Sequence, residues 1–402
     1  MCDIVRKARE MGVYTVVTDW YENSPAKQLA DKAYMVSTSD VDAVVHLIRE
    51  ERIDGVFTGY IDSTLPYYYE ICQKAGLPCY LTSATLECCT NKQTFKQVCK
   101  KVGLLTIPEA DLKNPGMLEY PVLIKPVDNS GSKGITVCCD ESVIEKAKVH
   151  ALRFSKSKGY IAERFMNCDY VAAYYAVRNG RAEVSMLMDK DMNRIGRGAV
   201  PYPTALVCPS RYDRKYMKYV HPLVQRLIDQ LGFQNGTFLI SFFVNGNYFY
   251  AVELTARLAA TREYLFIQDN TGEDLLAAHI CHALTGVFPS IKLTENISRE
   301  QGSRVYCMLF LFIREGIIGR IEGMEKIMGM RGVLDVLQLR SCGAKIRADG
   351  SYGQLFARIY LKTVKKDEMV ELVDKIRSLL HVYSEDGKQM LVTGFDAGRF
   401  FL

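Results

Sequence analysis

The sequence predicts an α/β protein followed by an α+β part, and two observations lead to this prediction. Amphipathic helices alternate with short apolar strands over the first 106 residues, which is typical of a doubly wound parallel sheet. Further along, turn residues such as Asn179-Gly180 separate neighbouring apolar runs, as expected for antiparallel hairpins. At 402 residues the chain is also longer than one hydrophobic core usually supports, so we expect two or three domains.

The composition excludes several classes of protein. Hydrophobic residues make up 48% and charged residues 24% of the chain, which indicates a globular protein rather than a disordered one. The net charge of +5 is not gathered into a basic stripe, so we expect no nucleic-acid partner. We expect neither a membrane span nor a signal peptide, because no window of about twenty apolar residues occurs and the first residues, MCDIVRKARE, are charged. The 13 cysteines lack framework spacing, which favours a reducing, cytoplasmic location.

The N-terminal part is expected to begin on a helix. Apolar residues recur at helical spacing from Ile4 to Met11, and a strand is expected at 13–17, with a further strand at 56–58 after the next helix. Asp19 and Asp62 fall close to strand ends, where ligands of open α/β sheets bind. A solvated loop carboxylate or a helix cap is the simpler interpretation of each aspartate.

One stretch of the chain, residues 120–137, has the pattern of a phosphate clamp. It reads YPVLIKPVDNSGSKGITV, so two apolar strands flank a glycine-containing loop, and Lys125 stands at the end of the first strand. Glycines in such a loop let backbone amides approach a phosphate closely, and a lysine supplies a compact cation. An ordinary hairpin beside a lysine with a buried stem is the alternative. The loop donors are Ser130, Gly131, Ser132, Lys133 and Gly134.

This pattern resembles the phosphate-binding core of the ATP-grasp ligases, which include carbamoyl-phosphate synthetase, biotin carboxylase and the amino-acid ligases. The resemblance implies a pre-ATP-grasp domain at 1–106, an ATP-grasp domain at 107–288 with its small lobe at about 108–187, and a C-terminal α+β part at 289–402. The family's first domain opens with a strand and a glycine-rich turn that this sequence lacks. We therefore expect the sheet to lack its first strand, and both a truncated sequence and a misassigned start remain open.

The resemblance also implies which residues bind ATP. Lys92, in NKQTFK, matches a basic residue that contacts the phosphates. Glu163, in YIAERFM, and the backbone that follows match the linker that bonds the adenine edge, while Asp169 matches the acid that takes the ribose hydroxyls. A solvated surface residue is the alternative for Lys92 and for Glu163. The implied nucleotide-binding set is Lys92, Lys125, Ser130, Gly131, Ser132, Lys133, Gly134, Glu163, Arg164, Phe165, Met166 and Asp169.

The run ELTARL resembles the family's motif for metal and phosphate. In that motif a glutamate, here Glu253, bridges Mg²⁺ or Mn²⁺ ions on the ATP phosphates, and an arginine, here Arg257, steadies the transferring group. The sequence departs from the family at two implied metal ligands. Thr255 stands where an asparagine is common, and Ser241 stands where an acid or glutamine is common. Hydroxyls are weaker magnesium ligands, so a site holding one ion well and a second poorly is expected, or a different ligand set.

The resemblance implies an ADP-forming ligase that activates a small-molecule carboxylate as an acyl phosphate and joins it to an amine or similar nucleophile. These small molecules are the expected partners, and a homodimer is left open. A nucleotide-binding pseudoenzyme with a regulatory or scaffold role is the alternative. His279 and His282, one helical turn apart, invite a zinc interpretation, but a helix packed in the core explains them more simply.

Overall fold

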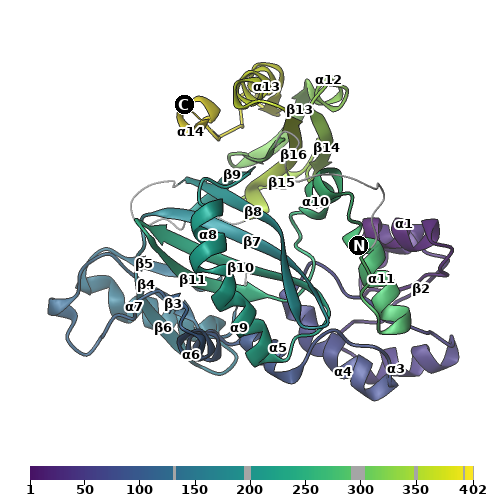
Figure 1. The fold of residues 1–402 in the computed structure, drawn as a ribbon. Helices are drawn as coiled ribbons and strands as arrows, with labels where there is room; N and C mark the ends of the chain where they lie inside the picture. The colour runs from purple at the N-terminus through teal and green to yellow at the C-terminus, as the bar shows by residue number, and fades with distance from the viewer. Residues whose placement is uncertain (130–132, 194–200, 291–303, 348–351, 393, 402) are drawn as a thin grey trace.

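The structure of the protein is a computed structural model that describes residues 1–129, 133–193, 201–290, 304–347, 352–392 and 394–401. Within these residues the strands form four sheets: one large mixed sheet, two three-stranded antiparallel sheets and one parallel pair. Figure 1 shows the large sheet at the centre, with a small lobe at one side and the N-terminal part at the other. The predicted combination of parallel α/β and antiparallel α+β structure is confirmed.

Helices make up most of the N-terminal part. Its only sheet among the described residues is the parallel pair β1 and β2, and each strand is three residues long. The elements are α1 (Cys2–Glu10), β1 (Val16–Thr18), α2 (Pro25–Leu29), β2 (Lys32–Tyr34), α3 (Val41–Glu50), the short 3₁₀ helix η1 (Asp62–Thr64), α4 (Leu65–Ala75), α5 (Ser83–Thr90) and α6 (Lys92–Val102).

Two strands predicted in this part from the sequence differ from the structure. The strand expected at 13–17 begins only at Val16, because the amide of Val13 donates to the carbonyl of Ala8 and so closes the turn that follows the first helix. The strand expected at 56–58 is wrong, since no strand is assigned there. The preceding Gly55 packs so tightly on α11 (Leu275–Thr285) that an added Cβ would lie 2.2 Å from the carbonyl oxygen of Ala283. This segment therefore packs against a helix.

The small lobe is a three-stranded sheet covered by one helix. Its elements are β4 (Val122–Pro126), β5 (Thr136–Cys138), α7 (Ile144–Phe154) and β6 (Tyr160–Arg164), and β4 lies between the other two strands. The predicted glycine hairpin is thus present, with Leu123 opposite Val137 on one side and opposite Glu163 on the other. Because β4 is hydrogen-bonded to a strand on each side, the sheet determines the direction in which the Lys125 side chain points.

The large sheet has the order β14-β16-β12-β9-β8-β7-β10-β11-β3. Because β12 pairs with β9, strands from both sides of the predicted boundary at 288 belong to one continuous layer. The domain boundaries themselves stay predictions. The strands are β3 (Leu105–Thr106), β7 (Asp169–Arg178), β8 (Arg181–Asn193), β9 (Tyr202–Cys208), β10 (Gly236–Asn245), β11 (Tyr248–Thr255), β12 (Val305–Phe312), β14 (Val333–Gln338) and β16 (Leu355–Thr363).

Alternating side chains give the large sheet two buried faces. One face packs against α9 (His221–Leu231), which follows α8 (Asp213–Tyr219), and its core includes Val171 and Tyr175. The other face, with Ala172 and Tyr174, packs against α10 (Tyr264–Thr271) and α11. This second face also carries the side chains predicted to act chemically.

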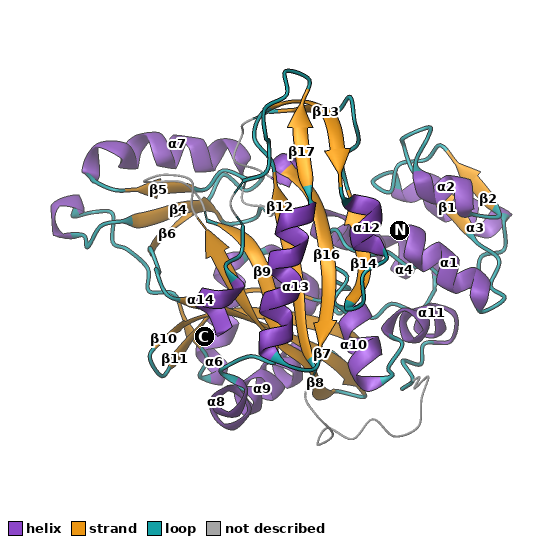
Figure 2. Ribbon diagram, turned by 90° about the horizontal axis from the view of Figure 1, so that it is seen from above, coloured by secondary structure: helices purple, strands orange, loops and turns teal. Residues whose placement is uncertain are grey.

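The C-terminal part adds helices and a small sheet to the far end of the large sheet. Figure 2 shows α13 lying along β12 and β16. Its remaining elements are β13 (Gly316–Glu322), α12 (Met324–Met328), β15 (Lys345–Ile346), α13 (Lys366–Leu379), β17 (His381–Ser384) and α14 (Ala397–Phe401).

Candidate active site

A buried carboxylate between two lysines lies where the small lobe meets α6. Glu163 on β6 is 2% exposed, and its two oxygens lie 2.5 Å from Lys125 Nζ and 2.9 Å from Lys96 Nζ. Burial alone would raise the pKa of the Glu163 carboxyl, but the two lysines hold this pKa below its usual value. The surface interpretation of Glu163 is therefore wrong. The sequence analysis missed Lys96, although it lies one helical turn after Lys92 on the same helix.

Lys92 is a third cation, partly buried, near Lys125 and Glu163. Its Nζ donates to the carbonyl oxygen of Asn129, at the edge of the glycine loop, and its backbone amide donates to Val127, 3.0 Å away. Burial, and then the charge of Lys125, lowers the pKa of Lys92 to about 8, while carboxylates including Glu253 oppose the shift. Lys92 thus lies within electrostatic reach of both the small lobe and β11. The interpretation as a solvated lysine does not fit this placement.

The ends of the glycine loop are held by the small lobe. Asp128 accepts hydrogen bonds from the amides of Lys156 and Ser157, at 3.2 and 2.7 Å. Gly134 has a φ of +77°, and a Cβ there would lie 2.7 Å from the Cβ of Phe154, so a side chain has no room. Lys133 is exposed. The other predicted loop donors, Ser130, Gly131 and Ser132, lie outside the described residues.

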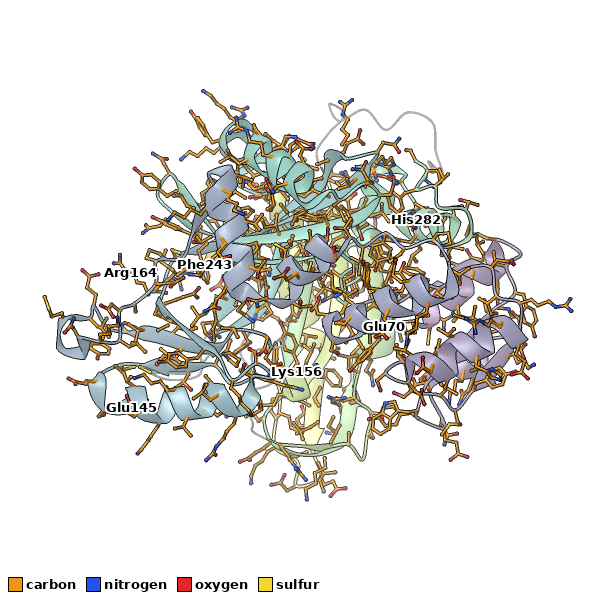
Figure 3. The ribbon with its side chains drawn as sticks, turned by 90° about the horizontal axis from the view of Figure 1, so that it is seen from below. Glu70, Glu145, Lys156, Arg164, Phe243 and His282 are labelled. Atoms are coloured by element: carbon orange, nitrogen blue, oxygen red, sulfur yellow. The ribbon has the colours of Figure 1, made fainter. Side chains whose placement is uncertain are left out.

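The predicted adenine linker runs from β6 into β7. The side chain of Arg164 points outward, where its Nη2 lies 3.2 Å from Glu119, and Figure 3 shows it at the edge of the molecule. The amides of Arg164 and Phe165 donate to the carbonyls of Pro108 and Pro121. Any contact of Arg164 with a base would therefore use its carbonyl group. Met166 is half-buried, and Asp169, exposed at the start of β7, accepts a hydrogen bond from the hydroxyl of Tyr212. The roles of these four residues toward a nucleotide stay predictions.

Glu253 stands on the second face of the large sheet, opposite Ser241 in the pairing of β11 with β10. It is exposed, whereas Ser241 is 1% exposed. The hydroxyl of Tyr170 on β7 lies 3.5 Å from Glu253 Oε1. Lys190 on β8 lies beside them, with its Nζ 3.5 Å from Ser241 Oγ and 4.2 Å from the centre of the Tyr170 ring. Four adjacent strands thus place one carboxylate and one ammonium group on the same face.

Asp62 holds Arg257 from the N-terminal part of the chain. Its oxygens accept from Arg257 Nε at 2.7 Å and Nη2 at 2.6 Å, and from the hydroxyl of Thr255 at 2.5 Å. Burial raises the pKa of the Asp62 carboxyl, but Arg257 outweighs burial and keeps this pKa below its usual value. The sequence-based preference for a solvated loop carboxylate at Asp62 is wrong. Thr255, predicted as a metal ligand, has an aspartate as its partner in this structure, and its metal role remains untested.

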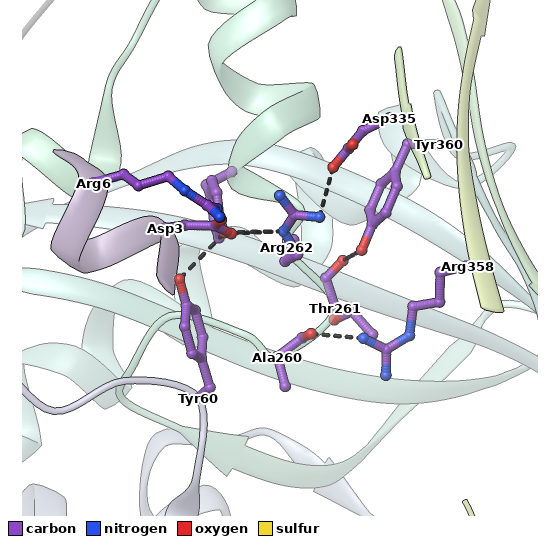
Figure 4. A network of polar contacts seen from close by, with 10 residues as sticks. Asp3, Arg6, Tyr60, Ala260, Thr261, Arg262, Asp335, Arg358 and Tyr360 are labelled. Atoms are coloured by element: carbon purple, nitrogen blue, oxygen red, sulfur yellow. Dashed lines mark hydrogen bonds and ion pairs between the residues drawn. The ribbon is translucent and has the colours of Figure 1, made fainter. Parts of the chain in front are cut away.

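The segment after Arg257 is bonded to the first helix and to two strands of the C-terminal part, as Figure 4 shows. Arg262 donates to Asp3 on α1 at 2.8 Å and to Asp335 on β14 at 2.6 Å. Arg358 and Tyr360 on β16 donate to the carbonyls just before it, at 2.7 and 2.9 Å. Arg262 has a φ of +62°, which costs energy for a residue with a Cβ, so these bonds impose its conformation. The sequence carries no local signal for this network.

The histidines of α11 belong to the core. His279 and His282 are 1% and 4% exposed and pack among Tyr80 and Phe288. Burial lowers the pKa of His279 to about 3, so its ring is neutral and accepts from or donates to Thr237 at 2.9 Å. Among the residues that the structure describes, no group of three or more His, Cys, Asp or Glu side chains is placed to hold a metal. The core interpretation of these two residues is confirmed.

No family model matches the chain. Solved structures with the same arrangement include an L-amino acid ligase from Bacillus licheniformis, with a TM-score of 0.78 and 19% identity over 96% of each chain. The biotin carboxylase domain of the Hydrogenobacter thermophilus 2-oxoglutarate carboxylase, in complex with MgADP and bicarbonate, has a TM-score of 0.74 and 17% identity over 97% of this chain and 88% of its own. The chain has the ATP-grasp fold, and the resemblance to ATP-grasp ligases that the motifs predicted is confirmed.

The chain is also similar in sequence to curated proteins. The formate-dependent phosphoribosylglycinamide formyltransferase of Sulfurisphaera tokodaii is 24% identical over 344 residues, which cover 82% of this chain and 83% of the relative. The enzyme of the same name from Prochlorococcus marinus strain MIT 9515 is 26% identical over 191 residues, and this match spans only about half of that relative, 49% of its length. Among the described residues, no helix is both long and apolar enough to cross a membrane.

Proposed function

We propose that this protein is an ATP-dependent, ADP-forming ligase that activates a small carboxylate as an acyl phosphate and transfers the acyl group to an amine. The observation that carries the proposal is the pair of cations at the glycine loop: Lys125 Nζ lies 2.5 Å from the buried Glu163, and Lys92 Nζ donates to the carbonyl oxygen of Asn129 at the edge of the loop. Two cations beside such a loop suit a nucleotide polyphosphate. The neighbour that was crystallised with MgADP supports ATP and Mg²⁺ as the nucleotide and the metal.

Each residue has a defined task in this proposal. Lys92 and Lys125 bind phosphate oxygens, and Glu253 would hold Mg²⁺ together with those oxygens. A bound Mg²⁺ would neutralise charge on the phosphates and so favour ADP as the leaving group. Arg257, oriented by both oxygens of Asp62, presents its remaining donors to the phosphoryl group as this group is transferred to the substrate carboxylate. Position and charge, rather than a covalent protein nucleophile, supply the rate enhancement.

The reaction balances in two steps. An oxygen of the substrate carboxylate attacks the γ-phosphorus of ATP, and the bond from this phosphorus to the ADP oxygen breaks. The amine then attacks the carbonyl carbon of the acyl phosphate, inorganic phosphate leaves with the bonding electron pair, and the amine loses a proton. The names of the relatives make formate the first carboxylate to test and phosphoribosylglycinamide the first amine.

A hydroxylamine trap tests this proposal directly. The protein is incubated with ATP, Mg²⁺, hydroxylamine and one carboxylate from a panel that begins with formate, and both hydroxamate and ADP are measured. We expect equal amounts of hydroxamate and ADP with at least one carboxylate. Glu253→Gln is expected to bind ATP yet to form neither product. If ATP binds but every carboxylate of a broad panel gives no hydroxamate, the ligase proposal is wrong and the pseudoenzyme interpretation gains support.

A further inference from the structure

Glu253 and the three residues around it form an unusual setting for a divalent metal. Glu253 is their only carboxylate, and the residue paired with it across the strands is the neutral Ser241. Tyr170 contributes a hydroxyl 3.5 Å from Glu253, and Lys190 contributes a positive charge. Two neighbouring divalent ions repel each other strongly and need several negative ligands between them. The protein side of this cluster provides one.

Lys190 is a cation without an anionic partner among the residues that the structure describes. It is only partly exposed, and no carboxylate among the described residues lies within ion-pair distance of its Nζ. Its Nζ contacts the Ser241 hydroxyl and the Tyr170 ring face, and Tyr352 lies within electrostatic reach of it; all three are neutral groups that stabilise an ammonium group without neutralising its charge. Desolvating a charged amine costs free energy unless a negative group compensates it. An anionic ligand on this face of the sheet would supply that compensation.

The orientation of Lys190 follows from the sheet. It lies directly opposite Tyr170 in the pairing of β8 with β7, and Tyr170 lies on the same face as Ala172, which is itself opposite Ser241. The ammonium group is therefore held on the Glu253 face by three strands. A loop residue would not be fixed in this way, since strand pairing alone determines the direction of the side chain.

We propose that Lys190 binds the phosphoryl group that ATP transfers, and that its ammonium supplies the second positive charge at a site with a single divalent ion. This inference rests on the proposed function. It accounts for Ser241 opposite Glu253, because a hydroxyl can remain next to an ammonium group, whereas a second divalent ion favours a stronger oxygen ligand there, such as a carboxylate or an amide. The γ-phosphoryl oxygens would lie between Lys190 on one side and the ion held by Glu253 on the other.

Two binding measurements test the inference without relying on turnover. In the first, Lys190→Met is titrated with the β,γ-imido analogue of ATP and with ADP. Loss of one charged hydrogen bond predicts at least about tenfold weaker binding of the ATP analogue, while the affinity for ADP stays within about threefold, since ADP lacks the group that Lys190 contacts. Lys190→Gln, which removes the charge but keeps a polar side chain, repeats the test and is expected to show the same selective loss.

Lys218→Met is the matched control. Lys218 also lies over a tyrosine ring, that of Tyr219, but it is exposed on α8, on the opposite side of the large sheet. We expect it to bind both nucleotides like the wild-type protein. Binding of ADP by Lys190→Met shows at the same time that this variant is folded. Equal affinities of the Lys190 variants and the wild type for the ATP analogue would refute the role of Lys190.

In the second measurement, Mn²⁺ is titrated by electron paramagnetic resonance with the protein in excess over the ATP analogue, so that all nucleotide is bound. We expect one Mn²⁺ per bound nucleotide in the wild type, and two in Lys190→Met combined with Ser241→Glu. Two ions in the wild type would overturn the inference and leave the ligase proposal intact. A wild-type protein that binds neither nucleotide would refute the proposed function, and the inference with it.

Discussion

Replacement of Lys125 by methionine tests the nucleotide clamp at its best-defined contact. The Lys125 side chain is 8% exposed, and its Nζ lies 2.5 Å from Glu163, which also has Lys96 at 2.9 Å. Methionine keeps most of the length of the side chain and removes only the charge. The variant therefore changes two separate quantities, the affinity for ATP and the free energy of unfolding.

The two magnitudes follow from the structure. A hydrogen bond from a charged group contributes about 1.5–3 kcal/mol, so the affinity for ATP should fall by roughly ten- to hundredfold. Removing one partner of a buried ion pair usually costs about 3–5 kcal/mol of stability. Because Lys96 still neutralises Glu163, we expect a smaller loss of about 1–3 kcal/mol in the free energy of unfolding.

Calorimetric titration with ATP and urea unfolding measure the two effects. Glu163→Gln is the companion variant: it releases Lys125 from its pair, so we expect a much smaller loss of ATP affinity than for Lys125→Met. The double variant should regain part of the lost stability but none of the affinity. The clamp assignment is refuted if Lys125→Met binds ATP within about threefold of the wild type. An equal loss in Glu163→Gln would show instead that this carboxylate itself contacts the nucleotide.

Three further outcomes follow from the site. Because the pKa of Lys92 is about 8 in the free protein and phosphates favour its charged form, ATP binding near pH 8 should take up a proton and weaken as the pH rises from 7 to 9. Titrations in buffers of different ionisation enthalpy measure this uptake, which Lys92→Met should abolish and which a pH-independent affinity would contradict. Asp62→Asn should lower the rate of hydroxamate formation by about ten- to hundredfold, because Arg257 loses one of its two charged bonds, while the affinity for ATP changes little. An equal loss of ATP affinity would argue against a role of Asp62 that is confined to positioning Arg257. Glu253→Gln should bind ATP with a higher requirement for Mg²⁺, read from titrations at graded Mg²⁺ concentrations, and an unchanged requirement would place the metal elsewhere.

The sequence by itself determined the local features of the site. The hairpin around Lys125 was predictable because turn glycines and short apolar strands specify each other within twenty residues. The helix that begins at Lys92 also depends on local residues, because the side chain of Asn91 accepts from the amides of Gln93 and Thr94 at its start. The order of clamp, linker and ELTARL motif along the chain then indicated the ATP-grasp fold, which the comparisons confirm.

Only the tertiary structure decided which charges face each other. Arg257 meets Asp62 across 195 positions of the chain, and Arg262 meets Asp3 across 259. Lys190 reaches Ser241 only because β8, β7 and β10 are neighbours in the sheet. From the sequence alone, a charged residue of the site cannot be told from a solvated surface group, because neither its partner nor its burial is visible in the local pattern. They are set by strand order and by packing between distant segments, so the chemistry of this site becomes visible only once the chain is folded.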